Sequence, residues 1–176
     1  MKIEQNDLVI LFSARFTTRK RPFDLLKALK KIDNSNLTIL FVGDGLDRKK
    51  MEHFAKNNNI KAIFTGFMNQ TEISKYYTIS DIGVVISDYD PSPKSMNEIM
   101  NFELPIIVTN VVGTAYDLIE DEINGFIVNV GDIESIAEKI NYFNNNRESL
   151  KIMGKKSFDI VQKWNFKQDV NGILDA

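Results

Sequence analysis

Short apolar runs alternate with segments of helical spacing along most of the sequence, and this alternation restricts the fold more than any other feature. The runs are continuous and β-branched, which is typical of strands buried on both faces of a parallel sheet. Six runs are predicted as strands: Leu8–Ala14, Leu37–Val42, Ala62–Gly66, Ile82–Ile86, Pro105–Val108 and Gly125–Val128. Helices between such strands form right-handed crossovers, so the predicted class is α/β: a Rossmann-like, doubly wound parallel sheet with helices on both faces.

The helices are predicted from apolar spacing and from residues that favour helix starts. Apolar positions recur at helical spacing in Phe23–Ile32, and Pro22 suits a first helical position. Asn69 and Asp132 are predicted to cap two further helices. A last helix is predicted from about residue 148 to residue 162.

Composition narrows the class of protein. The 176 residues are 43% hydrophobic and 26% charged, so residues 1–176 are expected to form one domain. A net charge of −2, from 22 basic and 24 acidic residues, argues against nucleic-acid binding through a dense basic face. The absence of cysteine excludes disulfides, thiolate metal sites and cysteine nucleophiles. Without a signal peptide or a membrane-length apolar run, a cytoplasmic location is expected.

Ligands of open α/β sheets bind beyond the carboxyl ends of the strands, so the loops that follow the strands are candidate sites. The loop after the first strand carries four cations, Arg15, Arg19, Lys20 and Arg21. They could form a phosphate site beside a helix start, where amide dipoles favour an anion. A solvated charged loop is the alternative.

The second loop, residues 43–45, opens a helix that begins near Leu46. Gly43 and Gly45 permit close approach of a ligand to the backbone, although a tight turn would also select glycine. Arg48 occupies the third glycine position of a dinucleotide fingerprint, which argues against a nicotinamide-binding domain.

The third loop follows the strand that ends at Gly66 and carries Phe67. Its flat ring, together with the backbone at Gly66, offers a surface on which a nucleotide base can lie. Phe67 can instead belong to the core or form a hydrophobic staple with the next helix.

The fourth loop contains two prolines that disfavour helix before Ser95. Ser95-x-x-Glu98 is typical of a capping box, in which Glu98 would reach back to the Ser95 amide. Alternatively, the Glu98 carboxylate accepts hydrogen bonds from ligand hydroxyls. Free amides at Ser95 and Met96, beside Lys94, are predicted to form a second anion-binding element.

Metal binding and histidine catalysis have little support. Asp88 and Asp90 form an Asp-x-Asp pattern, but neither histidine nor a further acidic cluster accompanies it, so no metal is expected. The single histidine, His53, lies in a polar helical stretch remote from these loops, where a surface role is expected.

In their order and spacing, these motifs resemble the C-terminal, donor-binding half of the group-1 (family four) retaining glycosyltransferases with the GT-B fold. The resemblance runs from about Leu8 to Trp164. Arg15 and Lys20 keep the five-residue offset of the family's Arg and Lys, which hold the donor diphosphate. Residues 42–45 match the family's Val-Gly-x-Gly loop, and residues 64–67 match the segment that passes the nucleotide base.

The family signature is two glutamates separated by seven residues. Glu98 matches the second, which binds the nucleotide ribose. The first position holds Asp90, whose side chain is one methylene shorter than glutamate. In the family, the residue at this position contacts the hydroxyls of the transferred sugar. Glu103 occupies a place where glycine is usual, whereas Ser80–Asp81 and Asn124–Gly125 fit the pattern.

The resemblance implies a metal-independent, cofactor-free enzyme of polysaccharide biosynthesis that transfers a hexose from a UDP- or GDP-linked sugar to a glycan or lipid-linked acceptor. Arg15, Lys20 and the amides near Ser95 would neutralise the diphosphate leaving group, and Asp90 would orient the sugar. The family's N-terminal half, which supplies the acceptor site, is not expected within these residues. The fragment alone is therefore expected to be inactive, and the full-length enzyme to be cytoplasmic and peripheral to the membrane.

Two other readings remain. One is a stand-alone nucleotide or nucleotide-sugar binding module that works with a separately encoded N-terminal half. The other is a flavodoxin-like or nicotinamide-binding domain, which lacks its glycine pattern here. The terminal helix of the glycosyltransferase family commonly crosses to the other half, so the resemblance implies that apolar residues near the C-terminus expose a hydrophobic surface in isolation: Trp164, Phe166, Val170, Ile173 and Leu174.

Overall fold

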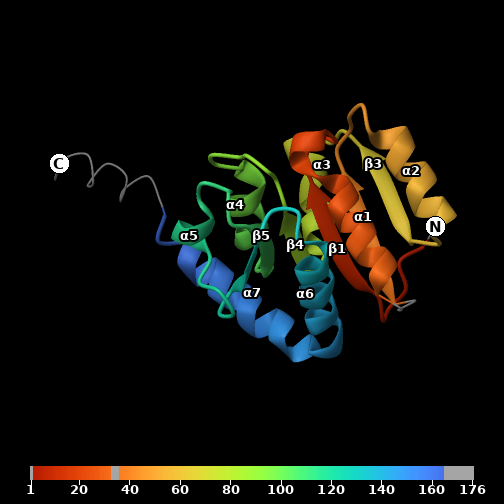
Figure 1. Ribbon diagram of the computed structural model, residues 1–176. Coiled ribbons are helices and arrows are strands. Elements are labelled where there is room, and N and C mark those ends of the chain that lie inside the picture. Colours follow the sequence, from red (N-terminus) through yellow and green to blue (C-terminus); the bar gives the residue numbers. More distant parts are fainter. Residues whose placement is uncertain (1, 33–35, 165–176) are drawn as a thin grey trace.

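A computed structural model describes residues 2–32 and 36–164, whose six strands form one parallel sheet in the order β3-β2-β1-β4-β5-β6 (Figure 1). The strands are β1 Leu8–Ser13, β2 Leu37–Val42, β3 Ala62–Gly66, β4 Ile82–Val85, β5 Ile106–Thr109 and β6 Gly125–Val128. Each observed strand end lies within one residue of its prediction, which confirms the predicted α/β class. From β1 the strand order runs through β2 to β3 on one side, and from β4 through β5 to β6 on the other. The strand order therefore changes direction between β1 and β4, and folds of this class bind ligands at such a switch point.

Helices cover both faces of this sheet. The helical elements are η1 Thr18–Lys20, α1 Pro22–Lys31, α2 Arg48–Asn57, α3 Gln70–Thr78, α4 Lys94–Asn101, α5 Ala115–Leu118, α6 Ile133–Asn145 and α7 Arg147–Val161. Buried side chains of α1, α2 and α6 pack on one face, and those of α3, α4 and α5 pack on the other. Helix α7 contributes Met153 to the first core and Val161 to the second, so it links the two layers.

The predicted starts of α1, α3 and α6 are confirmed. Pro22 is the first residue of α1. The side chain of Asn69 accepts a hydrogen bond from the Glu72 N–H at 2.9 Å, and Asp132 accepts one from the Ser135 N–H at 2.9 Å. These caps act within a single helical turn, which is why the sequence is sufficient to predict them.

The predicted capping box of α4 is wrong. Pro93, with φ −71° and ψ 117°, is the N-cap, and the helix begins at Lys94. Glu98 is therefore the fifth helical residue rather than the third, too far along the helix to reach back to the N-cap backbone. Its carboxylate is available for another partner.

Two segments of the family pattern hold the sheet together. The Asp81 carboxylate accepts a hydrogen bond from the Val9 N–H at 2.7 Å and so ties the start of β4 to β1. The fully buried Asn124 accepts from the Glu120 N–H at 2.8 Å and donates to the Leu118 carbonyl at 3.0 Å. A Cβ at Gly125 would overlap the Ile106 carbonyl oxygen, so the glycine permits close pairing of β6 with β5. These residues act in folding.

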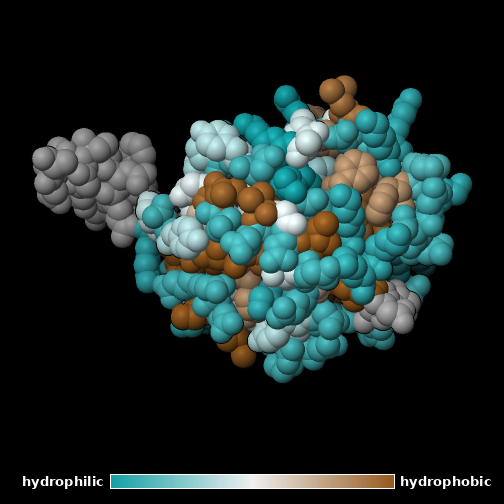
Figure 2. Space-filling view, in the orientation of Figure 1, coloured by the Kyte–Doolittle hydropathy of each residue, from teal (hydrophilic) through white to brown (hydrophobic). Residues whose placement is uncertain are grey.

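Figure 2 shows the face over α1, α6 and α7, where hydrophilic side chains predominate and hydrophobic ones gather in separate groups. Trp164 is 54% exposed, whereas the rest of the predicted apolar surface, residues 166–174, lies outside the described residues. Within residues 2–32 and 36–164, no helix is both long and apolar enough to cross a membrane.

Candidate functional site

A cavity of about 450 Å³ lies at the carboxyl ends of β1, β2 and β3. Its volume falls within the range of small-molecule sites, roughly 300–1,000 Å³. The structure brings four predicted site residues, Arg15, Gly43, Gly45 and Phe67, into its lining. A much smaller cavity shares Ser13 with it and adds two more, Lys20 and Ser95. Residues from four predicted loops therefore meet at one edge of the sheet.

The two glycines of the β2–α2 loop are needed for packing between loops. A Cβ at Gly43 would overlap the Ala14 carbonyl oxygen, and one at Gly45 would overlap the Phe16 carbonyl oxygen. Gly43 also has φ +137°, a backbone conformation that other residues rarely adopt. The N–H of Phe16 donates to the Asp44 carbonyl at 2.9 Å. Close packing against the β1–α1 loop is thus a reason for these glycines that neither interpretation from sequence contained.

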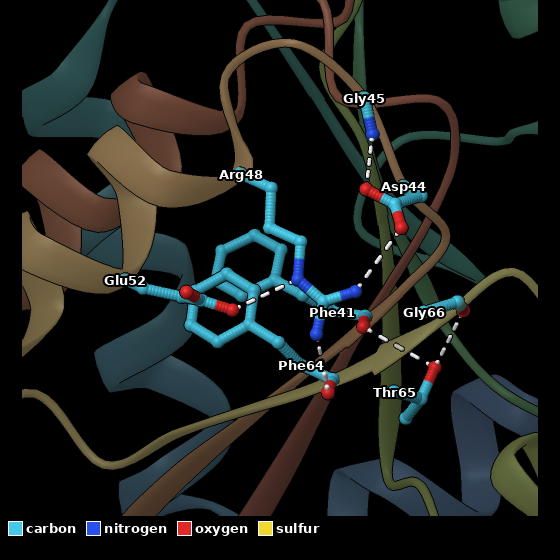
Figure 3. A network of polar contacts seen from close by, with 8 residues as sticks. All are labelled: Phe41, Asp44, Gly45, Arg48, Glu52, Phe64, Thr65 and Gly66. Atoms are coloured by element: carbon cyan, nitrogen blue, oxygen red, sulfur yellow. Dashed lines mark hydrogen bonds and ion pairs between the residues drawn. The ribbon is translucent and has the colours of Figure 1, made fainter.

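Arg48 joins the β2–α2 loop to the end of β3 (Figure 3). Its guanidinium donates to the Glu52 carboxylate at 2.8 Å, to Asp44 at 3.1 Å and to the Phe64 carbonyl oxygen at 3.4 Å. Asp44 in turn accepts from the Gly45 N–H at 2.7 Å. The Glu52 and Asp44 carboxylates raise the pKa of Arg48, so its charge is permanent. Arg48 thus ties the β2–α2 loop, which lines the cavity, to strand β3.

Phe67 is 82% exposed, which excludes the alternative that it belongs to the core. Its ring lines the cavity instead. Met68, which directly precedes the Asn69 N-cap, packs against the core in its place, as does Ile73 one turn into α3. An exposed aromatic ring beside a cavity of this size is available for stacking on a flat ligand.

Lys20 and Asp90 form an ion pair between the β1–α1 loop and the β4–α4 loop. Their side chains are 18% and 11% exposed, so solvent screens the pair less than a surface contact. The Asp90 backbone is fixed as well, because its carbonyl accepts from the Gly113 N–H at 2.9 Å. Arg15 is exposed, and its side chain has no ion pair or hydrogen bond with the described residues.

The carboxylates of the Asp-x-Asp pattern have different partners. Asp90 pairs with Lys20, whereas Asp88 lies 4.0 Å from the Arg21 guanidinium. Within the part of the chain that the structure describes, no three His, Cys, Asp or Glu residues cluster as metal ligands would. His53 lies on α2 and contacts Asn57 at 2.8 Å, away from the cavity lining.

The start of α4 offers fewer free amides than predicted. The Met96 N–H donates to the Pro93 carbonyl at 3.0 Å, which corrects the expectation that it is free, and the Met96 side chain is fully buried. The Ser95 N–H is the second of the helix and lacks an intrahelical acceptor, so it can donate to an anion. Lys94 is exposed at the first helical position.

Glu98 accepts a hydrogen bond of 2.6 Å from the Tyr77 hydroxyl. Tyr77 belongs to α3 and is almost completely buried, 1% exposed, and its hydroxyl oxygen lies 3.4 Å from Ser13 Oγ. From the sequence, Tyr77 is an apolar position of the helix capped by Asn69, and the pair Tyr76–Tyr77 resembles part of the family segment that passes the nucleotide base. Nothing in the helical spacing distinguishes it from Tyr76, because its partner lies 21 residues away in sequence.

Comparison with known proteins gives a consistent family. Glycosyl transferases group 1 match residues 1–159. Sulfoquinovosyl transferase of Arabidopsis thaliana is 26% identical over 151 residues, 84% of this chain and 29% of that protein. An uncharacterized glycosyltransferase of Methanocaldococcus jannaschii is 30% identical over 138 residues, 77% of this chain and 35% of that protein. The chain therefore spans about a third of these curated relatives.

The fold is also that of a solved structure. HepE from Anabaena, crystallised in complex with UDP, matches with a TM-score of 0.85 and 20% identity. The match covers 97% of this chain and 49% of that chain.

Proposed function

Because this chain belongs to the group-1 glycosyl transferases, we propose that it is the donor-binding half of a retaining, metal-independent hexosyltransferase. Its donor is a UDP- or GDP-linked sugar, and its acceptor is a glycan or a lipid-linked glycan. The observation that carries the proposal is the cavity of about 450 Å³ at the carboxyl ends of β1, β2 and β3. Lys20 lines the smaller cavity beside it, and Glu98 is connected to Ser13, which lines both cavities, through the Tyr77 hydroxyl. HepE from Anabaena, which has the same fold, was crystallised with UDP, and this supports a nucleotide ligand.

Each part of the donor has a partner of suitable chemistry. The base stacks on Phe67 in the cavity, and the Glu98 carboxylate accepts hydrogen bonds from the ribose hydroxyls. Lys20, Arg15 and the Ser95 N–H meet the diphosphate. As the bond to the sugar breaks, negative charge builds on the diphosphate, and these donors stabilise that leaving group without reorganising.

Asp90 would act at the sugar end of the same site. Its carboxylate pairs with Lys20. A diphosphate carries more negative charge than one carboxylate, so it competes with Asp90 for Lys20. Donor binding would then release Asp90 to accept hydrogen bonds from the hydroxyls of the transferred sugar, the role that the resemblance implies.

The acceptor site would come from a second, N-terminal half, whether on the same polypeptide or on a separate one. Attack by the acceptor then takes place in the cleft between the halves with retention of configuration at the sugar. A lipid-linked acceptor would place the complete enzyme at the cytoplasmic surface of a membrane.

Isothermal titration of the chain with UDP and GDP tests the site. At least one nucleotide is expected to bind, and Lys20→Ala is expected to weaken it roughly 10- to 100-fold, as for a lost hydrogen bond to a charged group. Glu98→Ala should weaken binding about tenfold. Lys50→Ala is the control. It removes an exposed cation of α2 that does not line the cavity, so this variant should bind the nucleotide with the affinity of the wild type.

Unchanged affinity in both Lys20→Ala and Glu98→Ala would refute the site. A sugar-transfer assay on the same protein tests the need for an acceptor half. No turnover is expected from this chain alone, and robust turnover would contradict that part of the proposal.

A further inference from the structure

The hydroxyl of Tyr77 contacts the one carboxylate that the proposed function assigns to the ribose. Glu98 lies on α4 and Tyr77 on α3, so two separate helices meet at this 2.6 Å hydrogen bond. Ser13, 3.4 Å from the same hydroxyl, lines both cavities of the site. The contact therefore lies at the boundary of the candidate site.

The Glu98 carboxylate retains most of its capacity for hydrogen bonds. Among the described residues, the Tyr77 hydroxyl is the one hydrogen-bond donor to it. An ionised carboxylate has about four acceptor positions, so the bond to Tyr77 leaves several for a ligand. Two adjacent ribose hydroxyls can be accepted without breaking the contact with Tyr77.

The tyrosine is itself held rigidly. Its ring stacks on Phe102 with centroids 5.1 Å apart and planes at 19°. Burial raises the pKa of the Tyr77 hydroxyl, and the Glu98 carboxylate raises it further, so the hydroxyl remains a donor at physiological pH. A buried, permanently protonated phenol is well suited to fix the orientation of a mobile carboxylate.

We propose that Tyr77 is a positioning residue that holds the Glu98 carboxylate in the orientation that accepts the ribose hydroxyls of the donor. The inference rests on the proposed function and assigns a role to a residue outside the family signature. Tyr77 does not touch the ligand. It acts by restricting Glu98, because the capping geometry that could have fixed this side chain is absent from α4.

The size of the effect follows from the rotamers of glutamate. Without the hydroxyl, Glu98 distributes over several staggered rotamers, and only a fraction of molecules holds the binding orientation. The apparent dissociation constant rises by the inverse of that fraction. Tyr77→Phe is therefore expected to weaken UDP binding roughly 3- to 10-fold.

Titration of the 176-residue chain with UDP and with 2′,3′-dideoxyuridine 5′-diphosphate tests this role. Tyr77→Phe keeps the ring and its stacking and should lose affinity for UDP but not for the dideoxy compound. It should cause no further loss when combined with Glu98→Ala. Tyr76→Phe is the matched control, since Tyr76 neighbours Tyr77 on α3 and its hydroxyl has no hydrogen bond with the described residues.

If Tyr77→Phe lost affinity for UDP and for the dideoxy compound equally, the effect would be structural and the positioning role would be overturned. Additive losses of affinity for UDP in the double variant would overturn it as well. Wild-type affinity for UDP in Tyr77→Phe, with Glu98→Ala impaired, would overturn the inference and leave the proposed function intact. A wild-type chain that binds neither UDP nor GDP would overturn both; if it binds GDP alone, GDP and its 2′,3′-dideoxy analogue replace the uridine compounds in the same test.

Discussion

Replacing Gly45 by alanine separates two reasons for a glycine beside a ligand cavity. The added Cβ would overlap the Phe16 carbonyl oxygen and lie 2.8 Å from both the carbonyl carbon and the nitrogen of Phe16. These are backbone atoms of a fully buried residue, so they cannot move aside as a flexible side chain would. Gly45 does not have a positive φ, so its substitution tests packing without backbone strain.

The cost can be worked from what must shift. Overpacking of this kind costs about 1–3 kcal/mol. Two backbone hydrogen bonds of Phe16 are weakened as well: its N–H donates to the Asp44 carbonyl at 2.9 Å, and its carbonyl accepts from the Asp47 N–H at 3.5 Å. Each costs roughly 0.5–1.5 kcal/mol. The lower entropy of unfolded alanine returns about 0.4–1 kcal/mol. We expect a net loss of about 1–6 kcal/mol, centred near about 3 kcal/mol, and the central value corresponds to roughly 6–12 °C in Tm for a chain of this size.

Thermal unfolding followed by circular dichroism measures this loss, and titration with UDP measures the accompanying change in the cavity. Leu46→Ala serves as the control, because Leu46 is in the same loop and 96% exposed, so its Tm should change little. A Gly45→Ala protein with wild-type Tm but no nucleotide binding would refute the packing argument. It would show that the glycine serves approach of the ligand.

Two further predictions concern stability. Asp7 is buried and accepts hydrogen bonds from Lys61, Thr38 and the Glu4 N–H. Desolvation raises the pKa of its carboxyl group, but these hydrogen bonds outweigh it, so the pKa is lowered below 3.8. The contribution of Asp7 to the free energy of unfolding is therefore present above about pH 4 and is lost as the pH falls through the lowered pKa. In urea unfolding, Asp7→Asn should reduce the free energy of unfolding by about 1–3 kcal/mol at pH 7 and by progressively less towards pH 2. An equal cost at both pH values would contradict this. Glu103 has φ 56°, so Glu103→Gly relieves roughly 1–2 kcal/mol of left-handed strain against about 0.5–1 kcal/mol of unfolded-state entropy. Its Tm should stay level or rise slightly, and a fall of more than about 4 °C would argue against this account.

The sequence was sufficient for features whose causes are local. Strands buried on both faces read as continuous apolar runs, so β1 to β6 were predicted with errors of one residue at most. The caps at Asn69 and Asp132 depend on a hydrogen bond three residues away. Proximity of the strand-end loops also followed, because parallel strands place their carboxyl ends at one edge.

The contacts that shape the candidate site depend on residues far apart in the chain. Glu98 has the spacing of a capping residue, but its partner Tyr77 is on another helix. Arg48 looked like a departure from a glycine fingerprint, and folding places it against the end of β3. For Phe67 the sequence left two roles open, a surface for a nucleotide base or a place in the core. Packing decided between them, because Met68 packs against the core and Phe67 is exposed.

Local hydrophobic pattern and turn chemistry therefore specify the elements and the edge at which ligands gather. The packing of α2, α3 and α4 onto the sheet decides which side chains point toward that edge and which atoms they contact there. The hydrogen bond between Tyr77 and Glu98 forms only when packing brings α3 and α4 together, so this pairing has no signature in sequence spacing.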